Sequence, residues 1–575
     1  MMTLFRFLRP YRTFVILVMV LTFLQTMSTL YLPNLMSNIV DVGVMKGNIS
    51  YIIKVGVFML LVTTLGGVAS VYASLYGAKA TAGFGQRLRS HLFAHVENFT
   101  VHEFDQLGTS SLIVRTTNDV MQVQQLVNMM LRMMVMAPLT ALGGIILAVY
   151  TDAKLSLVIV VAIPVLGIAI YLVMGHGLGL FRTMQKKVDR INRVLRENLT
   201  GVRVIRSFNR TSYEIDRFDE ANLDLTDTSV RVFQLMAAMM PVVMLIMNLS
   251  TLAIVWFGGI QINNGALQIG KLMAFIQYVM QIMFSVMMVS MMAFMIPRGQ
   301  ASALRINEVL AMTPEIKDPP HPQTTHAERG QIEFRHVTFT YPGAEEPAIS
   351  DISFSANAGE MTAIIGGTGS GKSTLMNLIL RFHDVATGNI LIDGVDVREM
   401  TQAQLRAKMG YVPQRAVLFS GSIAQNIRYG VDDASDEAVC HAADVAQVTE
   451  FLTQLPDGFD SVISQGGANL SGGQKQRLSM ARALVRRADI YLFDDSFSAL
   501  DYKTDAKLRT ALRREIASAT VLIVAQRAST VMDADRIVVL DDGRLVGIGT
   551  HHELMETCPV YQEIVLSQLS PEEIA

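Results

Sequence analysis

The chain has 575 residues, of which 51% are hydrophobic and only 17% are charged. An ordinary soluble chain carries roughly 25% charged residues, so this composition indicates a membrane protein with a soluble part attached. Intrinsic disorder is excluded, because so apolar a chain can offset its ordering entropy. The formal net charge of −2 provides no basic field, which argues against a nucleic-acid partner. Two cysteines are too few for a disulfide framework or a cysteine zinc site.

Six apolar stretches in the first 310 residues are long enough to cross a bilayer, which takes about 20 helical residues. They lie at residues 13–36, 53–77, 127–150, 155–180, 232–259 and 270–296. A secretory signal at the N-terminus is the weaker interpretation, because the first apolar run is too long and five more follow. We therefore expect an uncleaved first span, preceded by a short interfacial helix from Leu4 to Tyr11.

Lysine and arginine are unevenly distributed among the connections between these stretches. They are frequent in residues 79–125 and 181–231, whereas residues 37–50, 151–154 and 260–269 contain only Lys46 and Lys154. Because positive side chains favour the cytoplasmic side, the N-terminus and both long connections are predicted to be cytoplasmic. The protein is thus predicted to be a multi-pass protein of the cytoplasmic membrane.

Both long connections continue the helical periodicity of the spans before them. A helix over residues 51–98 would be about 72 Å long, more than twice the roughly 30 Å of hydrocarbon. We expect such helices to project into the cytoplasm and to dock on another domain at two loop tips, Phe104 to Asp119 and Arg206 to Glu214. Each tip is predicted to form a short surface helix bounded by turns. The alternative is loose loops with helical propensity, ending in ordinary turns.

The composition changes after the last apolar stretch. Residues 311–330 contain four prolines and mixed charge, which is typical of a linker. We therefore divide the chain into a transmembrane domain at 1–310, the linker at 311–330 and a soluble α/β domain at 331–575.

The soluble domain contains a phosphate-binding sequence pattern. The segment GGTGSGKS at 366–373 follows the strand-like MTAII and precedes a helical stretch, which is the setting that a P-loop requires. Its backbone N–H groups and the helix N-terminus would surround the phosphates of a nucleotide. Lys372 would neutralise the β- and γ-phosphates, and Ser373 would ligate Mg²⁺. The residues expected to contact the nucleotide here are Gly366, Gly367, Thr368, Gly369, Ser370, Gly371, Lys372, Ser373 and Thr374.

Two carboxylates follow a second strand-like segment, IYLF. A carboxylate at the end of a buried strand needs a cation, and Asp494 is placed to help Ser373 hold Mg²⁺, directly or through water. In the segment YVPQ, Gln414 could bring an amide oxygen to the same metal, and further upstream Tyr341 could stack on the adenine. Taken alone, Gln414 and Tyr341 would be unremarkable surface or core residues.

A second glycine-containing segment, LSGGQKQR at 470–477, also precedes a predicted helix. Ser471, Gly472, Gly473 and Gln474 would form another helix N-terminus suited to an anion. One nucleotide hardly needs two such sites from the same chain. The simplest interpretation is that this segment completes a nucleotide site on a second chain.

Five motifs follow the six spans: GGTGSGKS, YVPQ, LSGGQKQR, YLFDDSFSALD and IVAQRASTV. With GTSSLIVRTTNDV and ENLTGVRVIRSF in the long connections, they make the whole chain resemble a half-transporter of the ATP-binding cassette (ABC) exporter family. The resemblance implies a polytopic all-α membrane domain of type I followed by an α/β P-loop NTPase domain, together acting as a transport ATPase. It also implies a dimer that sandwiches two ATP molecules, each between the Walker motifs of one chain and the LSGGQ signature of the other. The two loop tips match the family's coupling helices.

The chain departs from the family pattern at two positions that serve hydrolysis. Family members carry Glu after the Walker B Asp and His in the switch segment, where this chain has Asp495 and Gln526. Asp is one methylene shorter than Glu, and Gln cannot carry the charge that His can. The resemblance is therefore closest to the nonconsensus subunit of bacterial heterodimeric multidrug exporters, which binds MgATP but hydrolyses it slowly. Its partner would supply the Glu, the His and an altered signature. The alternative is that Asp495 suffices for hydrolysis and that Gln526 is a neutral change.

The cargo is expected to be hydrophobic or amphipathic. Alternatives are a lipid flippase, an exporter of one metabolite, peptide or porphyrin, or a regulatory subunit that nucleotide only gates. Methionines line one face of the last span. They serve either to pack adaptably against neighbouring helices or to form a flexible cavity wall that accepts varied apolar compounds. This methionine stripe consists of Met273, Met280, Met287, Met291 and Met295.

Two isolated charges in the spans have open interpretations. Asp41 follows the first span and is either part of an outer gate or a solvated loop carboxylate. Arg132, near the cytoplasmic start of the third span, either faces a water-filled cavity or extends to the membrane surface.

Overall fold

The computed structural model of the chain describes the backbone of residues 3–324 and 329–569. Residues 325–328 of the predicted linker therefore lie outside the described residues. Three further side chains are not described: Leu178, Ala293 and Phe294.

The chain folds into two units. Residues 1–98 and 107–313 form the transmembrane unit, and residues 99–106 and 314–575 form the soluble unit. The short segment 99–106 comes from the first long connection but packs with the soluble unit. Each unit has its own hydrophobic core.

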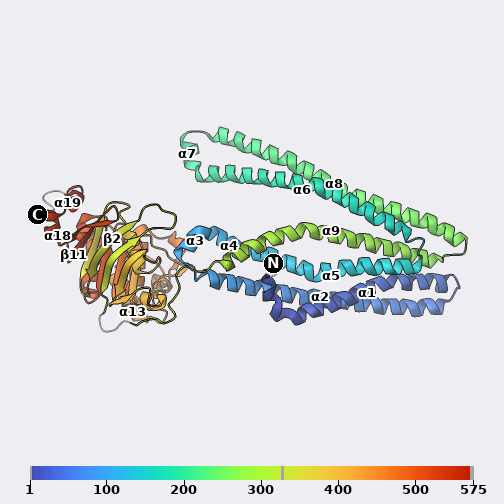
Figure 1. The fold of residues 1–575 in the computed structure, drawn as a ribbon, viewed down its shortest axis with the longest axis horizontal. Helices are drawn as coiled ribbons and strands as arrows, with labels where there is room; N and C mark the ends of the chain where they lie inside the picture. The colour runs from blue at the N-terminus through green and yellow to red at the C-terminus, as the bar shows by residue number, and fades with distance from the viewer. Residues whose placement is uncertain (1–2, 325–328, 570–575) are drawn as a thin grey trace. The chain divides into compact units, whose positions relative to one another are not determined.

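Long helices make up the transmembrane unit (Figure 1). They are α1 (Arg12–Asn38), α2 (Ile49–Val96), α5 (Val120–Thr151), α6 (Leu157–Thr200), α8 (Thr211–Asn263) and α9 (Ile269–Ala311). Within the described residues, six helical stretches are long and apolar enough to cross a membrane, and each contains one predicted span to within two residues at its ends. The chain is therefore a multi-pass membrane protein, as predicted.

Short elements connect these helices. They are η1 (Leu4–Tyr11), η2 (Ile39–Val44), α3 (Val101–Leu107), α4 (Thr109–Val114), η3 (Arg115–Asp119) and α7 (Val202–Ser207). The predicted short helix from Leu4 to Tyr11 is confirmed as η1, which has 3₁₀ geometry; its interfacial position stays a prediction. The structure also confirms the long helices, since the 48 residues of α2 span about 72 Å without a break.

The loop tips differ from the predicted single helices bounded by turns. The first tip is helical throughout as α3, α4 and η3, interrupted only at Gly108, whose φ of 74° turns the chain. The second tip has the predicted short helix, α7, but this helix ends at Ser207 and so lies mostly before residues 206–214. Residues 208–214 contain a turn at Asn209, with φ 53°, and the start of α8.

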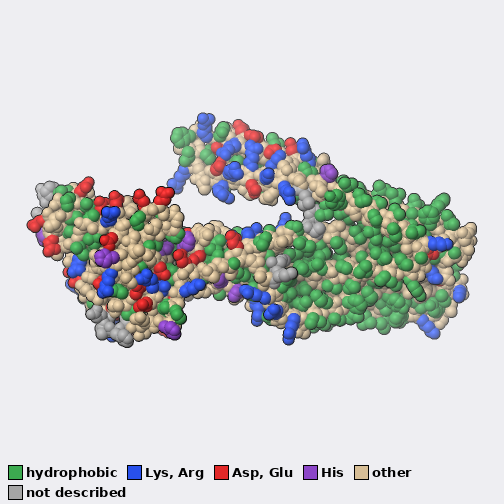
Figure 2. Space-filling view, in the orientation of Figure 1, with side chains coloured by type: hydrophobic (Ala, Val, Ile, Leu, Met, Phe, Trp, Pro, Cys, Tyr) green, Lys and Arg blue, Asp and Glu red, His purple; other side chains and the backbone are tan. Residues whose placement is uncertain are grey.

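The cytoplasmic parts of α6 and α8 form what we call the α6–α8 arm (residues 182–231), with α7 at its end (Figure 1). Figure 2 shows charged side chains along this arm and a hydrophobic surface over the far end of the unit. Ion pairs join the two helices of the arm: Lys187 with Asp224, Arg190 with Glu220 and Arg217 with Glu197. This charge pattern belongs in water, in agreement with the cytoplasmic placement of the arm.

Asp41 caps a helix that begins far away in the sequence. Its Oδ1 accepts a hydrogen bond from the backbone N–H of Gly270 at 2.7 Å, and its Oδ2 accepts one from the Ser37 hydroxyl at 3.1 Å. Gly270 lies in the first turn of α9, where N–H groups lack partners within the helix and favour an anion. The half-buried carboxylate thus ties α9 to the end of the first span, so it is not a solvated loop acid; the role in a gate stays a prediction.

We predict that Asp41→Ala destabilises the transmembrane unit by about 1–2 kcal/mol, the usual cost of losing a helix cap. Thermal unfolding of the full chain in detergent measures this effect. Asp41→Asn keeps an acceptor oxygen and should lose less. Unchanged stability of Asp41→Ala with abolished transport would instead favour the gate.

Arg132 contacts a neighbouring helix of the same unit. Its Nη1 lies 3.4 Å from the Ser74 hydroxyl of α2, and the side chain is half-buried. The two interpretations of Arg132, a cavity-facing charge and one that extends to the membrane surface, stay predictions.

Within its described residues, the soluble unit contains three sheets. A mixed sheet has the order β12-β11-β3-β10-β9-β6, an antiparallel sheet has the order β2-β1-β4-β5, and β7 pairs with β8. The strands are β1 (Ile332–Phe339), β2 (Ile349–Ala356), β3 (Met361–Gly366), β4 (Thr387–Ile392), β5 (Val395–Asp396), β6 (Met409–Val412), β7 (Gly421–Ser422), β8 (Val462–Ile463), β9 (Ile490–Asp494), β10 (Thr520–Val524), β11 (Arg536–Asp541) and β12 (Arg544–Gly549). Five neighbouring strands of the mixed sheet are parallel, from β11 to β6.

Helices cover and connect these sheets. They are α10 (Lys372–Ile379), α11 (Gln402–Ala407), α12 (Ile423–Arg428), α13 (Asp436–Val445), α14 (Thr449–Leu452), η4 (Gly458–Asp460), η5 (Gln465–Gly467), α15 (Gly472–Leu484), α16 (Tyr502–Glu515), α17 (Ala528–Val531), α18 (His551–Thr557) and α19 (Pro559–Leu566). The central strands β9 and β10 are buried along their whole length, as is usual for parallel strands between helices. The fold class predicted from the sequence, a six-helix membrane domain followed by an α/β domain, is confirmed.

Candidate nucleotide-binding site

The candidate site lies where four parallel strands end. The P-loop follows β3, Asp494 ends β9, Gln526 comes two residues after β10, and Gln414 comes two residues after β6. These strands are neighbours in the order β3-β10-β9-β6. Because the carboxyl ends of parallel strands meet at one edge of the sheet, residues from distant sequence positions converge there.

The P-loop needs glycine at several points, and Gly366 and Gly371 show the reason most directly. A Cβ on Gly366 would lie 2.2 Å from the carbonyl oxygen of Leu540. Gly371 has φ 91°, and a Cβ there would lie 2.8 Å from the carbonyl oxygen of Ala348. The loop then turns directly into α10, whose first residue is Lys372. With this arrangement, the backbone N–H groups of the loop and the N-terminus of α10 point toward the same region, where a phosphate can bind.

Lys372 is buried within the loop that it follows. Its Nζ donates hydrogen bonds to the carbonyl oxygens of Gly366, at 2.9 Å, and Gly367, at 2.6 Å. Burial lowers the pKa of Lys372, while the carboxylates of Asp495 and Asp494 oppose that shift. Phosphate oxygens would favour the charged ammonium in the same way.

Ser373 and Asp494 lie together, as a shared magnesium site requires. The Ser373 hydroxyl donates a hydrogen bond to Oδ1 of Asp494 at 2.9 Å. Burial raises the pKa of Asp494, and the Ser373 hydroxyl and Lys372 only partly offset this shift. A buried carboxylate of this kind gains from a cation, and Mg²⁺ prefers oxygen donors such as these. The donor set therefore fits Mg²⁺, with Gln414 as a further amide donor.

Asp495 connects the two remaining candidates. Its Oδ2 accepts hydrogen bonds from the side-chain amides of Gln414, at 3.3 Å, and Gln526, at 3.1 Å. The side chain is buried with 8% exposure, and the backbone has a left-handed φ of 44°, which Asp tolerates better than most residues. Two neutral amides thus share the oxygen that would have to orient an attacking water.

Tyr341 lies two residues after β1 and is fixed from two directions. Its hydroxyl is 3.1 Å from the Thr374 hydroxyl of α10. The rings of Phe339 and His383 contact it edge-on, with centroid distances of 4.8 Å and 5.4 Å. A ring held in this way is suited to stacking on a planar base.

The signature residues lie at the exposed N-terminus of α15. The Ser471 hydroxyl accepts a hydrogen bond from the backbone N–H of Gln474, and the Gln474 side chain accepts one from the backbone N–H of Ser471. Ser471 and Gly472 are exposed, and Gly473 is half-exposed. This capped helix end presents its free N–H groups outward, where a phosphate can approach.

Comparison with known proteins assigns the family. The model of the ABC transporter transmembrane region matches residues 15–286, and the ABC transporter model matches residues 349–498. An ABC transporter ATP-binding protein of Mycobacterium tuberculosis is 43% identical over 98% of this chain and 97% of its own length. The chain belongs to the ABC exporter family. It is thus a transport ATPase that binds ATP, with a cytoplasmic nucleotide-binding cassette.

Other relatives agree with this assignment. An ABC transporter ATP-binding protein of Bacillus subtilis is 40% identical over 98% of both chains. An ATP-dependent lipid A-core flippase of Chromobacterium violaceum is 33% identical over 93% of this chain and 91% of its own length. A bacterial Atm1-family ABC exporter solved with ATP bound has 26% identity and a TM-score of 0.81, covering 97% of this chain and 98% of that one.

Two glutamines outside the predicted site residues support the candidate site of this exporter. Gln476 of α15 is buried and donates hydrogen bonds to the carbonyl oxygens of Pro413 and Gln414, so it joins the signature helix to the strand end that carries Gln414. Gln568 donates to the carbonyl oxygen of Gln526 at 2.9 Å. Gln476 stands inside the LSGGQKQR motif, whereas no local pattern identifies Gln568.

His383 is a further residue that the sequence did not single out. It contacts the rings of both Phe339 and Tyr341, and burial lowers its pKa, so the ring is neutral near pH 7. We predict that His383→Ala weakens ATP binding about 2- to 10-fold, because an aromatic pair contributes about 0.5–1.5 kcal/mol. Titration of the full chain with a fluorescent, non-hydrolysable ATP analogue measures this. The exposed His321 provides the matched control, and equal affinities would contradict the role of His383.

Proposed function

We propose that this ABC exporter is one half of a heterodimer that exports hydrophobic and amphipathic compounds of the multidrug type. Its own Walker site holds MgATP but hydrolyses it slowly, and its signature completes the faster site on the partner. ATP binding closes the cassettes and turns the cavity outward, and hydrolysis at the partner-led site resets the exporter.

The observation that carries this proposal is the environment of Asp495. Its short side chain is engaged by the amides of Gln414 and Gln526, and neither amide can take up a proton. A side chain shortened by one methylene withdraws its carboxylate by about 1.5 Å, and a misplacement of that size can cost about 100-fold in rate. Retained nucleotide and metal binding is supported by the contacts of Lys372 with the P-loop carbonyl oxygens and of Ser373 with Asp494.

Two exposed surfaces support a dimer. The N-terminus of α15 presents the signature outward, as an intermolecular nucleotide site requires. At the end of the α6–α8 arm, Leu199, Val204 and Phe208 are exposed by 76%, 60% and 74%. Apolar side chains grouped at the cytoplasmic end of a charged arm are typical of a surface that another protein covers. The cassette of the partner is the occupant that the family arrangement implies.

The methionine stripe of α9 supports a broad cargo. Met273, Met280, Met291 and Met295 are each exposed by 37–61%, whereas Met287 packs on the core of the unit. Packing within this chain therefore leaves most of the stripe free. Flexible thioether side chains can adapt to ligands of different shape. The stripe is thus suited to line a cavity between two half-transporters.

A lipid cargo is the second candidate. It is favoured by relatives such as the lipid A-core flippases of Chromobacterium violaceum and Desulfotalea psychrophila, which are 33% and 34% identical. ATPase stimulation in nanodiscs separates the two: chemically diverse drugs should stimulate a multidrug exporter, whereas only particular lipids should stimulate a flippase.

Purification of the tagged chain from its native membrane tests the heterodimer. We expect a second half-transporter to copurify in equal amount, with Glu and His at the positions of Asp495 and Gln526. Vesicles containing the pair should accumulate cargo against its gradient when supplied with ATP, which a regulatory subunit would not achieve. Recovery of a homodimer with rapid ATP turnover would overturn the proposal.

A further inference from the structure

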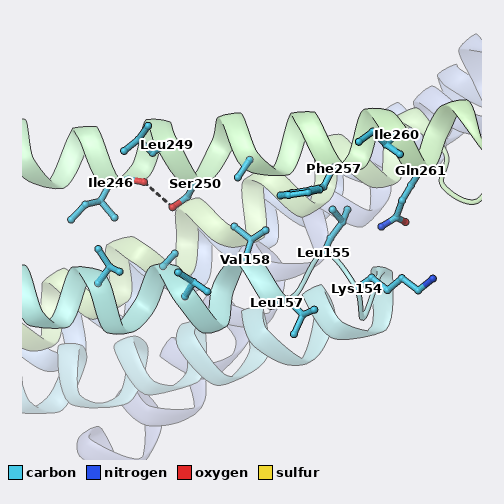
Figure 3. Close-up of a pocket in the computed structure, with 14 residues that line it drawn as sticks. Lys154, Leu155, Leu157, Val158, Ile246, Leu249, Ser250, Phe257, Ile260 and Gln261 are labelled. Atoms are coloured by element: carbon cyan, nitrogen blue, oxygen red, sulfur yellow. Dashed lines mark hydrogen bonds between the residues drawn. The ribbon is translucent and has the colours of Figure 1, made fainter.

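A groove of about 660 Å³ runs between the first turns of α6 and the last turns of α8 (Figure 3). Its walls are almost wholly aliphatic and aromatic, and they include Leu157, Val158, Val161, Leu249, Phe257 and Ile260. The one polar side chain of the wall, Ser250, donates its hydroxyl to the carbonyl oxygen of Ile246 at 2.7 Å. The wall thus offers no free polar group of its own to a ligand.

Two polar side chains mark one end of this groove. Lys154 precedes α6, Gln261 lies in the last turn of α8, and Figure 3 shows both at the same end. Lys154 is exposed and has no ion pair or hydrogen bond to its ammonium group among the described residues. The neighbouring acid, Asp152, instead accepts a hydrogen bond from the backbone N–H of Leu155 at 2.7 Å. A free cation therefore stands at the mouth of an apolar groove.

The length of the groove matches one leaflet of a bilayer. Leu157 and Val165 both line it, and the helix between them rises about 12 Å, a little under half of the roughly 30 Å hydrocarbon thickness. Lys154 lies in a connection that the distribution of positive charge places on the outer side. The cation is thus at the level of the outer headgroups, and the apolar walls lie beside the outer acyl chains.

The lining and the charge together indicate the occupant. The wall offers no free polar group to a hydrated ligand, whereas a free ammonium group stands at one end. Both features match a slender apolar chain with a negatively charged head.

We propose that the groove binds an acyl chain of an anionic phospholipid from the outer leaflet, whose phosphate pairs with Lys154 and accepts a hydrogen bond from the Gln261 amide. This lipid is a bound component of the bilayer and not the cargo. The proposal holds whether the exporter is a heterodimer or a homodimer.

Native mass spectrometry of the full chain, delipidated in detergent and then supplied with phosphatidylglycerol or phosphatidylcholine, tests this site. The wild type should retain one phosphatidylglycerol in preference to phosphatidylcholine. Lys154→Glu should weaken that retention about tenfold or more, the size expected for a lost hydrogen bond between charged groups. Lys46→Glu, a change at the other lysine of the outer connections, is the matched control and should bind as the wild type does.

A second variant tests the apolar part of the groove. Val161→Trp should fill it and remove retention of both lipids, whereas Leu60→Trp, on a residue of similar exposure in α2, should not. If Val161→Trp does not fold, Val165→Phe makes the same test with a smaller side chain. Retention that ignores headgroup charge would overturn the proposal. So would a Val161→Trp chain that keeps the lipid but loses its partner, because the partner would then be what covers the groove.

Discussion

The double substitution Asp495→Glu with Gln526→His is expected to raise ATP hydrolysis by the isolated chain about 100-fold. The chain carries both a complete P-loop and an intact LSGGQ signature, so two copies can form sites that lack only these two side chains. Glu extends the carboxylate by about 1.5 Å toward the γ-phosphate, and correct placement of a reacting group is worth a factor of this size. His removes the Gln526 amide that now holds Oδ2 of Asp495.

Single-turnover hydrolysis of ATP by the full chain in nanodiscs measures this gain. Asp495→Glu alone should give an intermediate rate, because Gln526 still occupies the region of the carboxylate. Lys372→Ala added to the double variant should return the rate to the background, which shows that the gained turnover arises in the Walker site. A wild-type chain that already turns over as fast as the double variant would show that Asp495 suffices.

The P-loop could be predicted from the sequence because its geometry is local. Glycines, a lysine and a serine between a strand and a helix specify the loop with no knowledge of the rest of the chain. Asp494 could be predicted for a similar reason, since it directly ends an apolar strand. The structure places Ser373 and Asp494 in hydrogen-bond contact, 121 residues apart in the sequence.

The environment of Asp495 could not be derived in the same way. Gln414, Asp495 and Gln526 follow three different strands, and their contact depends on the order β10-β9-β6 in the sheet. No local pattern encodes that order. The family resemblance indicated that these residues matter, but the sharing of one carboxylate oxygen by two amides emerges only from the folded sheet.

Asp41 illustrates the same limit in the transmembrane unit. The sequence showed a charge beside a span, for which a gate and a solvated loop were the obvious interpretations. Its partner, the N–H of Gly270, lies 229 residues away. Helix periodicity, in contrast, is a local property that continues through the bilayer into water, so the long helices α2 and α6 were predictable.

A second large effect on ATP turnover is expected from a substitution in the LSGGQ signature. Gly472→Asp should lower ATP turnover by the assembled heterodimer about 100- to 1000-fold, the loss seen when a group that stabilises transition-state charge is removed. A Cβ on Gly472 would meet no atom within 4 Å, so the substitution is compatible with the fold of this chain. Its carboxylate would instead place negative charge at the exposed N-terminus of α15, where the γ-phosphate of the partner-bound ATP is proposed to lie.

The matched variant is Asp495→Asn, which removes the acid of this chain's own Walker site. If the two sites are unequal as proposed, Asp495→Asn should leave more than half of the turnover, whereas Gly472→Asp should leave almost none. Steady-state ATPase activity of the purified pair decides between the outcomes, with ATP binding to each variant measured in parallel to show that both cassettes are folded. Equal losses from the two variants would mean that both sites share the hydrolysis, and the division of labour between the chains would have to be abandoned.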